Sequence, residues 1–511
     1  MAYDAVVIGA GHNGLVAAAY LARAGRKALV LERRDVIGGA CVTEEVWPGY
    51  RVSTAAYLCS LLHPRIIEEL ELRRFGLEIY RRETSGFAPF PDGSYLLIHA
   101  DSAETRRELE RFCAGDVDAY FEFERDIETA ADVLEPYFFQ QSPSLGAIAD
   151  AFAAAGIPGL FEPLFVGSVR DLLDARFKDE RLKAVLATDG LIGTCAGPSD
   201  PGTAYVLLHH YMGRALGARG LWGYVRGGMG SITRAVADYG RSRGLEIRCS
   251  SEVCSVIMQQ GRAAGVCLDS GEEIRANMVL SNADPIETYA MSRGNLPEEI
   301  LFAAARWRNK GVSCKINMAV CELPDFTALP GREPGPQHLG TVHFSPSMEF
   351  LELAWQDASG GRPSAQPMVE MYIQTATDSS LAPSGKHILS CFTQYFPYDL
   401  ADGLENVVEG ERYYRRVLDV ISLYAPNVPA SVEAYQVLTP RDLETRFGLT
   451  GGHIFHGDIT PDQMFGGRFG STGPETCIPG LYLCGSGAFP GGCVSGVPGF
   501  NAARRAMEMG N

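Results

Sequence analysis

Three glycines and a glutamate near the start of the chain have the types and spacing of a phosphate-binding turn. Gly9, Gly11 and Gly14 follow an apolar run at residues 4–8. Glycines at these positions permit a tight turn, a close approach of backbone to a pyrophosphate, and close packing of a helix on a strand. Glu32 lies 18 residues beyond Gly14 and can accept hydrogen bonds from a ribose. Together these residues predict that the chain binds a dinucleotide.

The residues around this turn supply the elements that must position it. Residues 4–8 read as a buried parallel strand, residues 15–24 as a helix and residues 27–32 as a second strand. The helix N-terminus would present unpaired N–H groups and the positive end of its dipole to the phosphates. Because strand, glycines, helix, strand and acid follow in the order of a βαβ unit, the signal is stronger than that of a glycine motif alone.

A second glycine pair follows Glu32 and favours a flavin over a nicotinamide nucleotide. Arg33 begins a five-residue run that leads to Gly38 and Gly39, with Ala40 next. A second glycine turn lets backbone pass close to a cofactor whose pyrophosphate already lies on the first helix. In isolation, an ordinary loop with a glycine pair is the alternative. Beside the first turn, the Glu-x5-Gly-Gly run resembles the extended fingerprint of FAD-binding oxidoreductases.

Four longer segments resemble one family of flavoproteins. They are YDAVVIGAGHNGLVAAAYLARAG with LERRDVIGGACVTEE, GLIGTCAGPSDPGTAYVLLHHYMG, LWGYVRGGMGSITRAVADYG and GLYLCGSGAFPGGCVSGVPGFNAA. Together they resemble the phytoene dehydrogenase-related flavoproteins of the flavin amine oxidase and phytoene desaturase superfamily. The resemblance covers nearly the whole chain and implies FAD and a redox reaction on an organic substrate. It also implies an α/β fold in which a Rossmann-like FAD-binding domain is interleaved with an α+β substrate domain.

The order of predicted elements agrees with two interleaved domains. We expect residues 1–95, 222–300 and 465–511 to form the FAD-binding domain, and residues 96–221 and 301–464 to form the substrate-binding domain. Residues 273–276 and 278–282 read as two strands, the second returning to the parallel sheet. A final buried strand at residues 481–485 leads to a helix from about residue 499.

The resemblance places further residues at the cofactor. It implies that Gly485, Ser486, Gly496 and Val497 belong to the second half of the flavin site. A glycine-rich turn before a helix can direct N–H groups at the cofactor, and a helix N-terminus would stabilise negative charge on a reduced flavin. Val253 lies in a segment that resembles the strand whose backbone meets adenine, and a plain strand valine is the alternative.

Lys315 and three consecutive residues, His209, His210 and Tyr211, are the candidate catalytic residues. The segment around Lys315 resembles the amine oxidase strand whose lysine holds a water beside the flavin, and a surface lysine on a strand edge is the alternative. A histidine can shuttle protons near neutral pH. Adjacent residues face different ways, so at most one of the two histidines is expected to reach a pocket. Hydrogen bonding in the core is the alternative for either ring.

Composition limits the other classes of function. The formal net charge is −17 and no basic tract is present, which argues against nucleic acid binding. The 13 cysteines include no Cys-x-x-Cys pair, which argues against a dithiol mechanism and fits reduced thiols. His453 and His456 lie three residues apart, but no flanking acid or cysteine completes a convincing site, so no metal is predicted.

The start of the chain favours a cytoplasmic protein. The first predicted strand begins at about residue 3, which leaves no room for a signal peptide. No stretch reaches the ~18 uncharged apolar residues of a membrane-spanning helix. A local apolar patch could still make a peripheral membrane contact.

Three hypotheses for function follow. The first is an FAD-dependent dehydrogenase or desaturase that abstracts a hydride from a C–H bond of an apolar substrate and forms a double bond. An isoprenoid-like substrate is implied by the resemblance alone, and oxygen or a quinone would be the electron acceptor. The second is a flavin amine or imine oxidase using oxygen, which Lys315 favours. The third is an FAD-loaded scaffold or regulatory protein with little turnover. The oligomeric state stays open.

Overall fold

The predicted βαβ unit opens the fold. The computed structural model describes residues 3–292 and 296–509. Strand β1 (Tyr3–Ile8), helix α1 (His12–Arg23) and strand β2 (Ala28–Leu31) follow in order, and β1 and β2 pair in parallel. Helix α1 begins three residues earlier than predicted, so Gly14 lies inside its first turn rather than before it. Its alanine-rich sequence is a strong helix former and is buried from Asn13 to Ala22.

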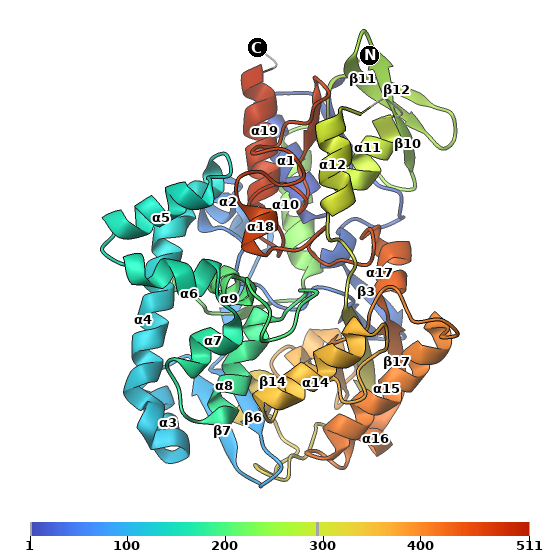
Figure 1. The fold of residues 1–511 in the computed structure, drawn as a ribbon. Coiled ribbons are helices and arrows are strands. Elements are labelled where there is room, and N and C mark those ends of the chain that lie inside the picture. The colour runs from blue at the N-terminus through green and yellow to red at the C-terminus, as the bar shows by residue number, and fades with distance from the viewer. Residues whose placement is uncertain (1–2, 293–295, 510–511) are drawn as a thin grey trace.

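The first sheet carries this unit at its centre (Figure 1). Its strand order is β10-β11-β12-β1-β2-β9, with β18 beside β12. The remaining strands are β9 (Glu246–Arg248), β10 (Val253–Gln259), β11 (Arg262–Leu268), β12 (Glu273–Ser281) and β18 (Leu481–Leu483). The prediction of two strands across residues 273–282 is wrong, because β12 is continuous. One half of β12 pairs antiparallel with β11 and the other half pairs parallel with β1, so a single strand serves both patterns.

Helices α1, α10 (Gly230–Ser242) and α19 (Val497–Met509) pack together beside the first sheet (Figure 1). A Cβ added at Gly499 would lie 2.1 Å from the backbone oxygen of Asn13. Glycine at this position therefore lets α19 approach α1 closely, and α19 begins two residues earlier than predicted. Helices α2 (Pro64–Glu69), α11 (Pro285–Ser292) and α12 (Glu298–Arg306) complete this part.

A second, mostly antiparallel sheet has the order β17-β13-β16-β15-β14-β6-β7. Its strands are β6 (Thr84–Pro89), β7 (Tyr95–His99), β13 (Ser313–Val320), β14 (Thr341–Phe344), β15 (Met368–Tyr372), β16 (His387–Gln394) and β17 (Val432–Leu438). Residues 84–95, which we expected in the FAD-binding domain, contribute strands to this sheet through the parallel pairing of β6 with β14. Pairing over such a sequence distance leaves no local signal, which explains the misplaced boundary.

Helices enclose the second sheet on both flanks (Figure 1). One flank carries α3 (Ser102–Cys113), α4 (Val117–Leu134), α5 (Leu145–Ala154), α6 (Phe161–Phe165), α7 (Val169–Asp174), α8 (Glu180–Ala187) and α9 (Thr203–Tyr211). The helices that follow later in the chain, up to residue 464, are α13 (Pro336–Leu339), α14 (Met348–Ser359), α15 (Asn406–Ser422), α16 (Val428–Ser431), α17 (Pro440–Phe447) and α18 (Pro461–Met464). The structure also has two small two-stranded sheets. One pairs β3 (Thr43–Trp47) with β4 (Tyr50–Ser53), and the other pairs β5 (Ile79–Arg81) with β8 (Gly223–Val225).

Within residues 3–292 and 296–509, none of the helices combines the length and apolar character that a bilayer crossing requires. None of the 13 cysteines, all of which lie in these ranges, forms a disulfide with another.

Candidate active site

A cavity of about 390 Å³ lies at the carboxyl ends of β1 and β2. The predicted cofactor residues that line it are Gly9, Gly11, Glu32, Arg33, Gly39, Ala40, Val253 and Ser486. They come from the first glycine turn, the end of β2, the second glycine turn, the start of β10 and the loop after β18. The fold thus brings together segments from opposite ends of the chain. We call this space the nucleotide cavity.

Close packing at the first turn explains two of its glycines. A Cβ added at Gly14 would lie 2.2 Å from the backbone oxygen of Gly9, and one added at Gly11 would lie 2.5 Å from Nδ2 of Asn282. Asn282 follows β12 and also lines the nucleotide cavity. Any side chain at Gly14 would push α1 away from β1, so the glycine sets the distance between helix and strand.

The carboxylate of Glu32 is fixed by backbone donors. It accepts hydrogen bonds from the N–H of Ala10 at 2.8 Å and from the N–H of Arg34 at 3.0 Å. The side chain is 6% exposed. A carboxylate can accept about four hydrogen bonds, so Glu32 keeps acceptor capacity for hydroxyl groups in the cavity. Arg33 donates from Nη2 to the backbone oxygen of Thr445 at 3.0 Å, which ties α17 to the cavity rim.

Other predicted cofactor residues lie behind the lining. Gly14, Gly38, Gly485, Gly496 and Val497 do not line either of the two cavities described here. The N–H of Gly38 donates to the backbone oxygen of Ala10 at 2.9 Å, which joins the two glycine turns. Gly496 has a φ of 75°, and Val497 is the buried first residue of α19. These residues shape the backbone around the cavity.

Two imidazoles at the nucleotide cavity each have a buried ring nitrogen without a partner. Within the described residues, Nε2 of His12 and Nδ1 of His456 have no hydrogen-bond partner. Both residues line the cavity. Burial lowers the pKa of His12 to about 4, and burial with the nearby charge of Arg468 lowers the pKa of His456 to about 3. Unsatisfied buried polar atoms are rare, so these nitrogens indicate a polar ligand between them. With the helix N-terminus of α1, they fit the phosphates of FAD.

A second cavity of about 240 Å³ adjoins the first, and we call it the substrate cavity. The residues that line both are His12, Ala40, Leu449, Ile454 and Ser486. The remaining walls come from the second sheet, from α4, α8, α9 and α17, and from loops that include residues 55–58 and 493–494. A dinucleotide in the first cavity can therefore extend its ring past this shared wall into the second.

Lys315 points into the substrate cavity from the middle of β13. The residue is 4% exposed, and burial lowers the pKa of its amine to about 7. Its Nζ donates to Oδ1 of Asn317 at 2.9 Å and to Oγ of Ser390 at 2.5 Å. Nδ2 of Asn317 donates to the backbone oxygen of Thr54 at 3.2 Å, which orients Oδ1 toward Lys315. A neutral amine has two N–H groups, so these bonds leave its lone pair available.

The chain has relatives of known family. Residues 14–322, more than half of the chain, match the family described as flavin containing amine oxidoreductase. The chain is 41% identical to mouse pyridine nucleotide-disulfide oxidoreductase domain-containing protein 2, over 98% of this chain and 92% of that protein. This chain belongs to the flavin-containing amine oxidoreductase family.

Two further relatives extend the comparison. Phytoene desaturase (neurosporene-forming) of Cereibacter sphaeroides is 26% identical over 97% of this chain and 92% of that protein. Cyclohexylamine oxidase from Brevibacterium oxydans shares the fold, with a TM-score of 0.62 at 17% identity over 100% of this chain and 99% of that one. The predicted resemblance, the α/β fold and the FAD cofactor are confirmed, and the chain is an FAD-dependent oxidoreductase.

The two adjacent histidines of α9 have different environments in this flavoprotein. His210 lines the substrate cavity, whereas His209 lines neither cavity. Nδ1 of His210 lies 2.8 Å from the backbone oxygen of Val206, which assigns the ring proton to Nδ1 and leaves Nε2 facing the Cys493 thiol at 3.8 Å. Neither ring nitrogen of His209 forms a hydrogen bond of standard geometry with the described residues, and burial lowers its pKa to about 3. Tyr211 lines the substrate cavity and donates to Glu124 at 2.9 Å.

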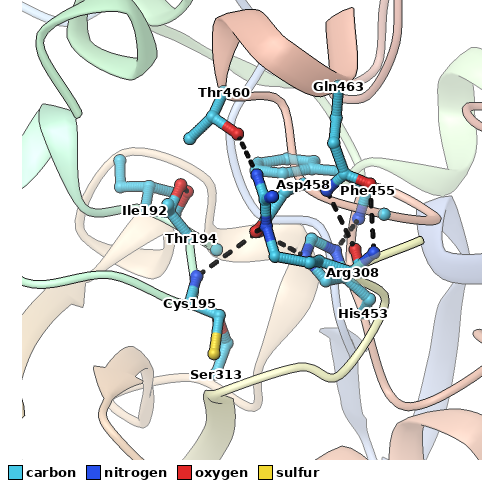
Figure 2. Close-up of polar contacts among 12 residues, drawn as sticks. Ile192, Thr194, Cys195, Arg308, Ser313, His453, Phe455, Asp458, Thr460 and Gln463 are labelled. Carbon is cyan, nitrogen blue, oxygen red and sulfur yellow. Dashed lines mark hydrogen bonds and ion pairs between the residues drawn. The ribbon is translucent and has the colours of Figure 1, made fainter. Parts of the chain in front are cut away.

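A polar junction holds three distant segments together beside the cavities of this flavoprotein (Figure 2). The carboxylate of Asp458 accepts from Nε2 of His453 at 3.0 Å, from Nε of Arg308 at 2.9 Å and from the N–H of Cys195 at 3.4 Å. Arg308 also donates to Oγ1 of Thr460 at 2.7 Å. His453 is thus a partner of Asp458, which is a structural role. His456, the other histidine of this segment, is the one that reaches the nucleotide cavity.

Several residues at the site were missed by the sequence interpretation. They are His12, Asn282 and His456 at the nucleotide cavity, and Arg82, Asp189, His343 and Glu370 at the substrate cavity. His12 lies inside the first glycine fingerprint, where a large polar residue was itself a signal. The residues of the substrate cavity come from separate segments with no motif, so only the folded chain reveals them.

Proposed function

We propose that this flavoprotein removes a hydride from a C–H bond of a small organic substrate and forms a double bond. The observation that carries the proposal is the substrate cavity, which shares a wall with the nucleotide cavity and has Lys315 on its surface. Its volume of about 240 Å³ would be shared between the flavin ring and the substrate. Apolar residues such as Ile98, Ile192 and Phe392 line much of it and suit an apolar substrate body.

The residues of the chain would orient the substrate and accept its proton. Bound FAD supplies a ring that accepts the hydride and its two electrons. Loss of a hydride and formation of a double bond also require loss of a proton from the neighbouring carbon or nitrogen. Lys315, with its free lone pair, would accept that proton at Nζ, while Asn317 and Ser390 hold the amine in place. Oxygen or a quinone would then take the two electrons.

Oxidation of a C–N bond, with oxygen as acceptor, is the second candidate. The observation that favours it is the same buried amine, whose pKa of about 7 allows it to exchange a proton near neutral pH. Support for both reactions comes from relatives named as a desaturase and as an amine oxidase. The two candidates differ in product, C=C against C=N, and only the second requires oxygen as its acceptor.

Anaerobic stopped-flow measurements of the purified yellow protein against a metabolite library would test the proposal. A substrate should bleach the flavin absorbance, and mass spectrometry should find a product two hydrogens lighter. Hydrogen peroxide released on admission of air would assign oxygen as the acceptor, and bleaching reversed only by a quinone would contradict the oxidase. The product's C=C or C=N bond would distinguish the two candidates. A flavin that no library fraction bleaches would contradict both and would support the scaffold hypothesis.

A further inference from the structure

One wall of the substrate cavity is a row of residues from four neighbouring strands of the second sheet. Lys315 on β13 pairs with Phe392 on β16, Phe392 pairs with Glu370 on β15, and Glu370 pairs with His343 on β14. All four residues line the cavity. Neighbouring strands lie about 4.8 Å apart, so the backbones of Lys315 and His343 are about 14 Å apart. The cavity therefore has two distant ends, one at Lys315 and one at His343.

The end at His343 is polar. Arg82 and Asp189 also line the cavity and do not line the nucleotide cavity. Nη1 of Arg82 donates to Oγ1 of Thr341 at 3.0 Å, and Thr341 lies two residues before His343 on the same face of β14. Oγ1 of Thr188 lies 3.4 Å from Nδ1 of His343, and Asp189 is the next residue along the chain. We call Arg82, Asp189 and His343 the polar end of the cavity.

Arg82 has a nitrogen to spare at the polar end. It is 5% exposed, and its Nε donates to the backbone oxygen of Trp222 at 2.9 Å. Its guanidinium lies 5.5 Å from the ring centre of Tyr224. Neither this bond nor that to Thr341 uses Nη2. A guanidinium has five N–H donors and no acceptor, so Arg82 can donate a further hydrogen bond to a ligand.

Asp189 is a neutral carboxyl group at neutral pH. Burial and the charges of Glu370 and Glu124 raise its pKa to about 8, and the charge of Arg82 lowers this pKa without outweighing them. Within the described residues, the carboxyl group forms no hydrogen bond. A protonated carboxyl has one O–H donor, so Asp189 offers a second donor at the polar end.

Glu370 supplies part of the charge that keeps Asp189 protonated. It is 1% exposed, and its Oε2 accepts from the hydroxyl of Tyr372 at 2.5 Å. Burial alone would raise the pKa of Glu370, but His343, 3.5 Å from Oε1, and Tyr372 hold it below its usual value. Glu370 is thus the ionised acid of the pair. Its charge offsets that of Arg82, so the polar end suits an uncharged ligand group.

The other ionisable groups packed around Asp189 lie behind the wall or stay uncharged. Burial raises the pKa of Glu124 to about 7, but Glu124 accepts from Tyr211 at 2.9 Å and does not line the cavity. Burial raises the pKa of the nearby phenols and lowers that of the nearby imidazole, so these groups are neutral at neutral pH. They are Tyr57, Tyr120, Tyr211 and His210.

We propose that Nη2 of Arg82 and the O–H of Asp189 donate hydrogen bonds to a carbonyl oxygen of the substrate, which is an elongated apolar molecule with this carbonyl at the end remote from the oxidised bond. A carbonyl oxygen has two lone pairs and no proton, so it suits two donors. The bond to be oxidised lies toward Lys315, so the carbonyl serves recognition and not activation. This inference rests on the proposed function, because it assigns the substrate of the same cavity.

Binding of two probes to the FAD-loaded protein at several pH values would test the inference. 2-Octanone and 2-methyl-1-octene have the same shape, and only the first has a carbonyl oxygen. The affinity for the ketone should fall about tenfold between about pH 7 and about pH 9 as Asp189 ionises, while the affinity for the alkene stays constant. Titration calorimetry and the shift of the flavin spectrum would measure both affinities.

Variants of Asp189 distinguish a donor from a charge. Asp189→Asn keeps an N–H donor, so it should bind the ketone at pH 7 within about threefold of the unmodified protein, but without the pH dependence. Asp189→Leu should weaken ketone binding about tenfold at pH 7 and leave alkene binding unchanged. Glu370→Gln should shift the fall in ketone affinity to lower pH. Asp126→Asn, which removes a carboxylate of α4 that pairs with Arg176 at 2.7 Å, should change neither affinity.

The outcomes separate this inference from the proposed function. A ketone affinity that does not change between pH 7 and pH 9 in the unmodified protein would overturn it, and that measurement needs no variant to fold. A fall that persists in Asp189→Asn would overturn it as well. If the carbonyl site is confirmed but no metabolite bleaches the flavin, the site stands and the proposed reaction fails. If metabolites are oxidised but ketone binding ignores pH, the reaction stands and the carbonyl site fails.

Discussion

The nucleotide cavity and the substrate cavity of this flavoprotein use the chain in different ways. The nucleotide cavity is shaped largely by backbone, through glycines that set the distances between α1, β1 and the loop after β12. The substrate cavity is lined by residues of the second sheet, of several helices and of loops that include residues 55–58 and 493–494. A cavity shaped by backbone fits one shape of ligand, and it leaves the side chains of the surrounding residues free to vary. A side-chain site can change its ligand by substitution while the fold stays the same.

This difference separates what is common to the family from what is particular to this chain. FAD binding depends on packing that no side chain can replace, such as the contact of Gly14 with Gly9. We expect substrate choice to depend instead on side chains that line the substrate cavity, such as Lys315. Relatives can therefore share the cofactor and fold while acting on different molecules.

The largest expected effect is at the backbone-shaped cavity. In Gly14→Ala, the new Cβ would lie 2.2 Å from the backbone oxygen of Gly9, so α1 must move. We expect FAD affinity to fall by about 100-fold, since overpacking of this kind costs about 1–3 kcal/mol. The ratio of flavin to protein absorbance after purification measures how much FAD the variant retains. Gly159→Ala is the matched control, because a Cβ there has no neighbour within 4 Å. Full flavin content in Gly14→Ala would contradict the backbone account.

A large effect is also expected at the side-chain cavity, but on rate and not on cofactor content. Lys315 accepts a proton only when neutral, so the rate of flavin bleaching should rise as pH increases through about 7. Lys315→Met should lower that rate by about 100-fold and remove this pH dependence. Lys310→Met is the control, because its side chain is 54% exposed and pairs with Asp399. The same pH dependence in Lys315→Met would show that another group accepts the proton.

The polar junction of Figure 2 should affect stability more than it affects either cavity. Burial alone would raise the pKa of Asp458, but His453 and Arg308 hold it below its usual value. The ionised carboxylate of Asp458 therefore stabilises the fold at pH values above about 3.9, the pKa of an aspartate in the unfolded chain. This stabilisation is lost as the pH falls through the lower pKa of Asp458 in the folded protein. We expect Asp458→Asn to lower the free energy of unfolding by about 2 kcal/mol and to weaken its dependence on acid.

Asp462→Asn is the matched control for this junction. Asp462 also pairs with Arg308, at 2.8 Å, but its side chain is 62% exposed, whereas that of Asp458 is 2% exposed. An exposed pair contributes less than about 1 kcal/mol. Denaturant titrations of both variants at several pH values would compare them. Equal losses would mean that burial of Asp458 adds nothing to the junction.

The same contrast explains how much the sequence could predict. Backbone requirements leave glycines at fixed spacing, so the βαβ unit and the FAD cofactor were predicted correctly from the first residues. Pairing between distant strands leaves no such spacing, so residues 84–95 were grouped with the FAD-binding domain although they pair into the second sheet. Strand β12 was divided because its two halves have different partners, although its backbone is continuous.

The site shows the same limit. Lys315 was found through a resemblance, while the cluster of Asp189 and Glu370 carries no motif and comes from a helical turn and a distant strand. Two neighbouring histidines of α9 looked equivalent in the sequence, but only His210 reaches the substrate cavity. Which of two adjacent residues faces a cavity depends on how the helix packs, and the sequence of the helix alone does not determine that.

His12 and His456, like Glu32, are side chains at the backbone-shaped cavity, and the two histidines give the smallest predicted effect. Their pKa values of about 4 and about 3 keep both rings neutral near neutral pH. Anionic phosphates beside them would raise these values, so FAD should bind more tightly as pH falls. We expect affinity to rise about threefold between about pH 8 and about pH 6.

Fluorescence titration of the apoprotein with FAD would measure this pH effect. His12→Asn combined with His456→Asn should make the affinity independent of pH over that range. His338→Asn is the control, since His338 is buried in the second sheet's domain and hydrogen bonds to the backbone oxygen of Pro324 at 2.8 Å. A pH dependence that persists in the double variant would assign it to another group.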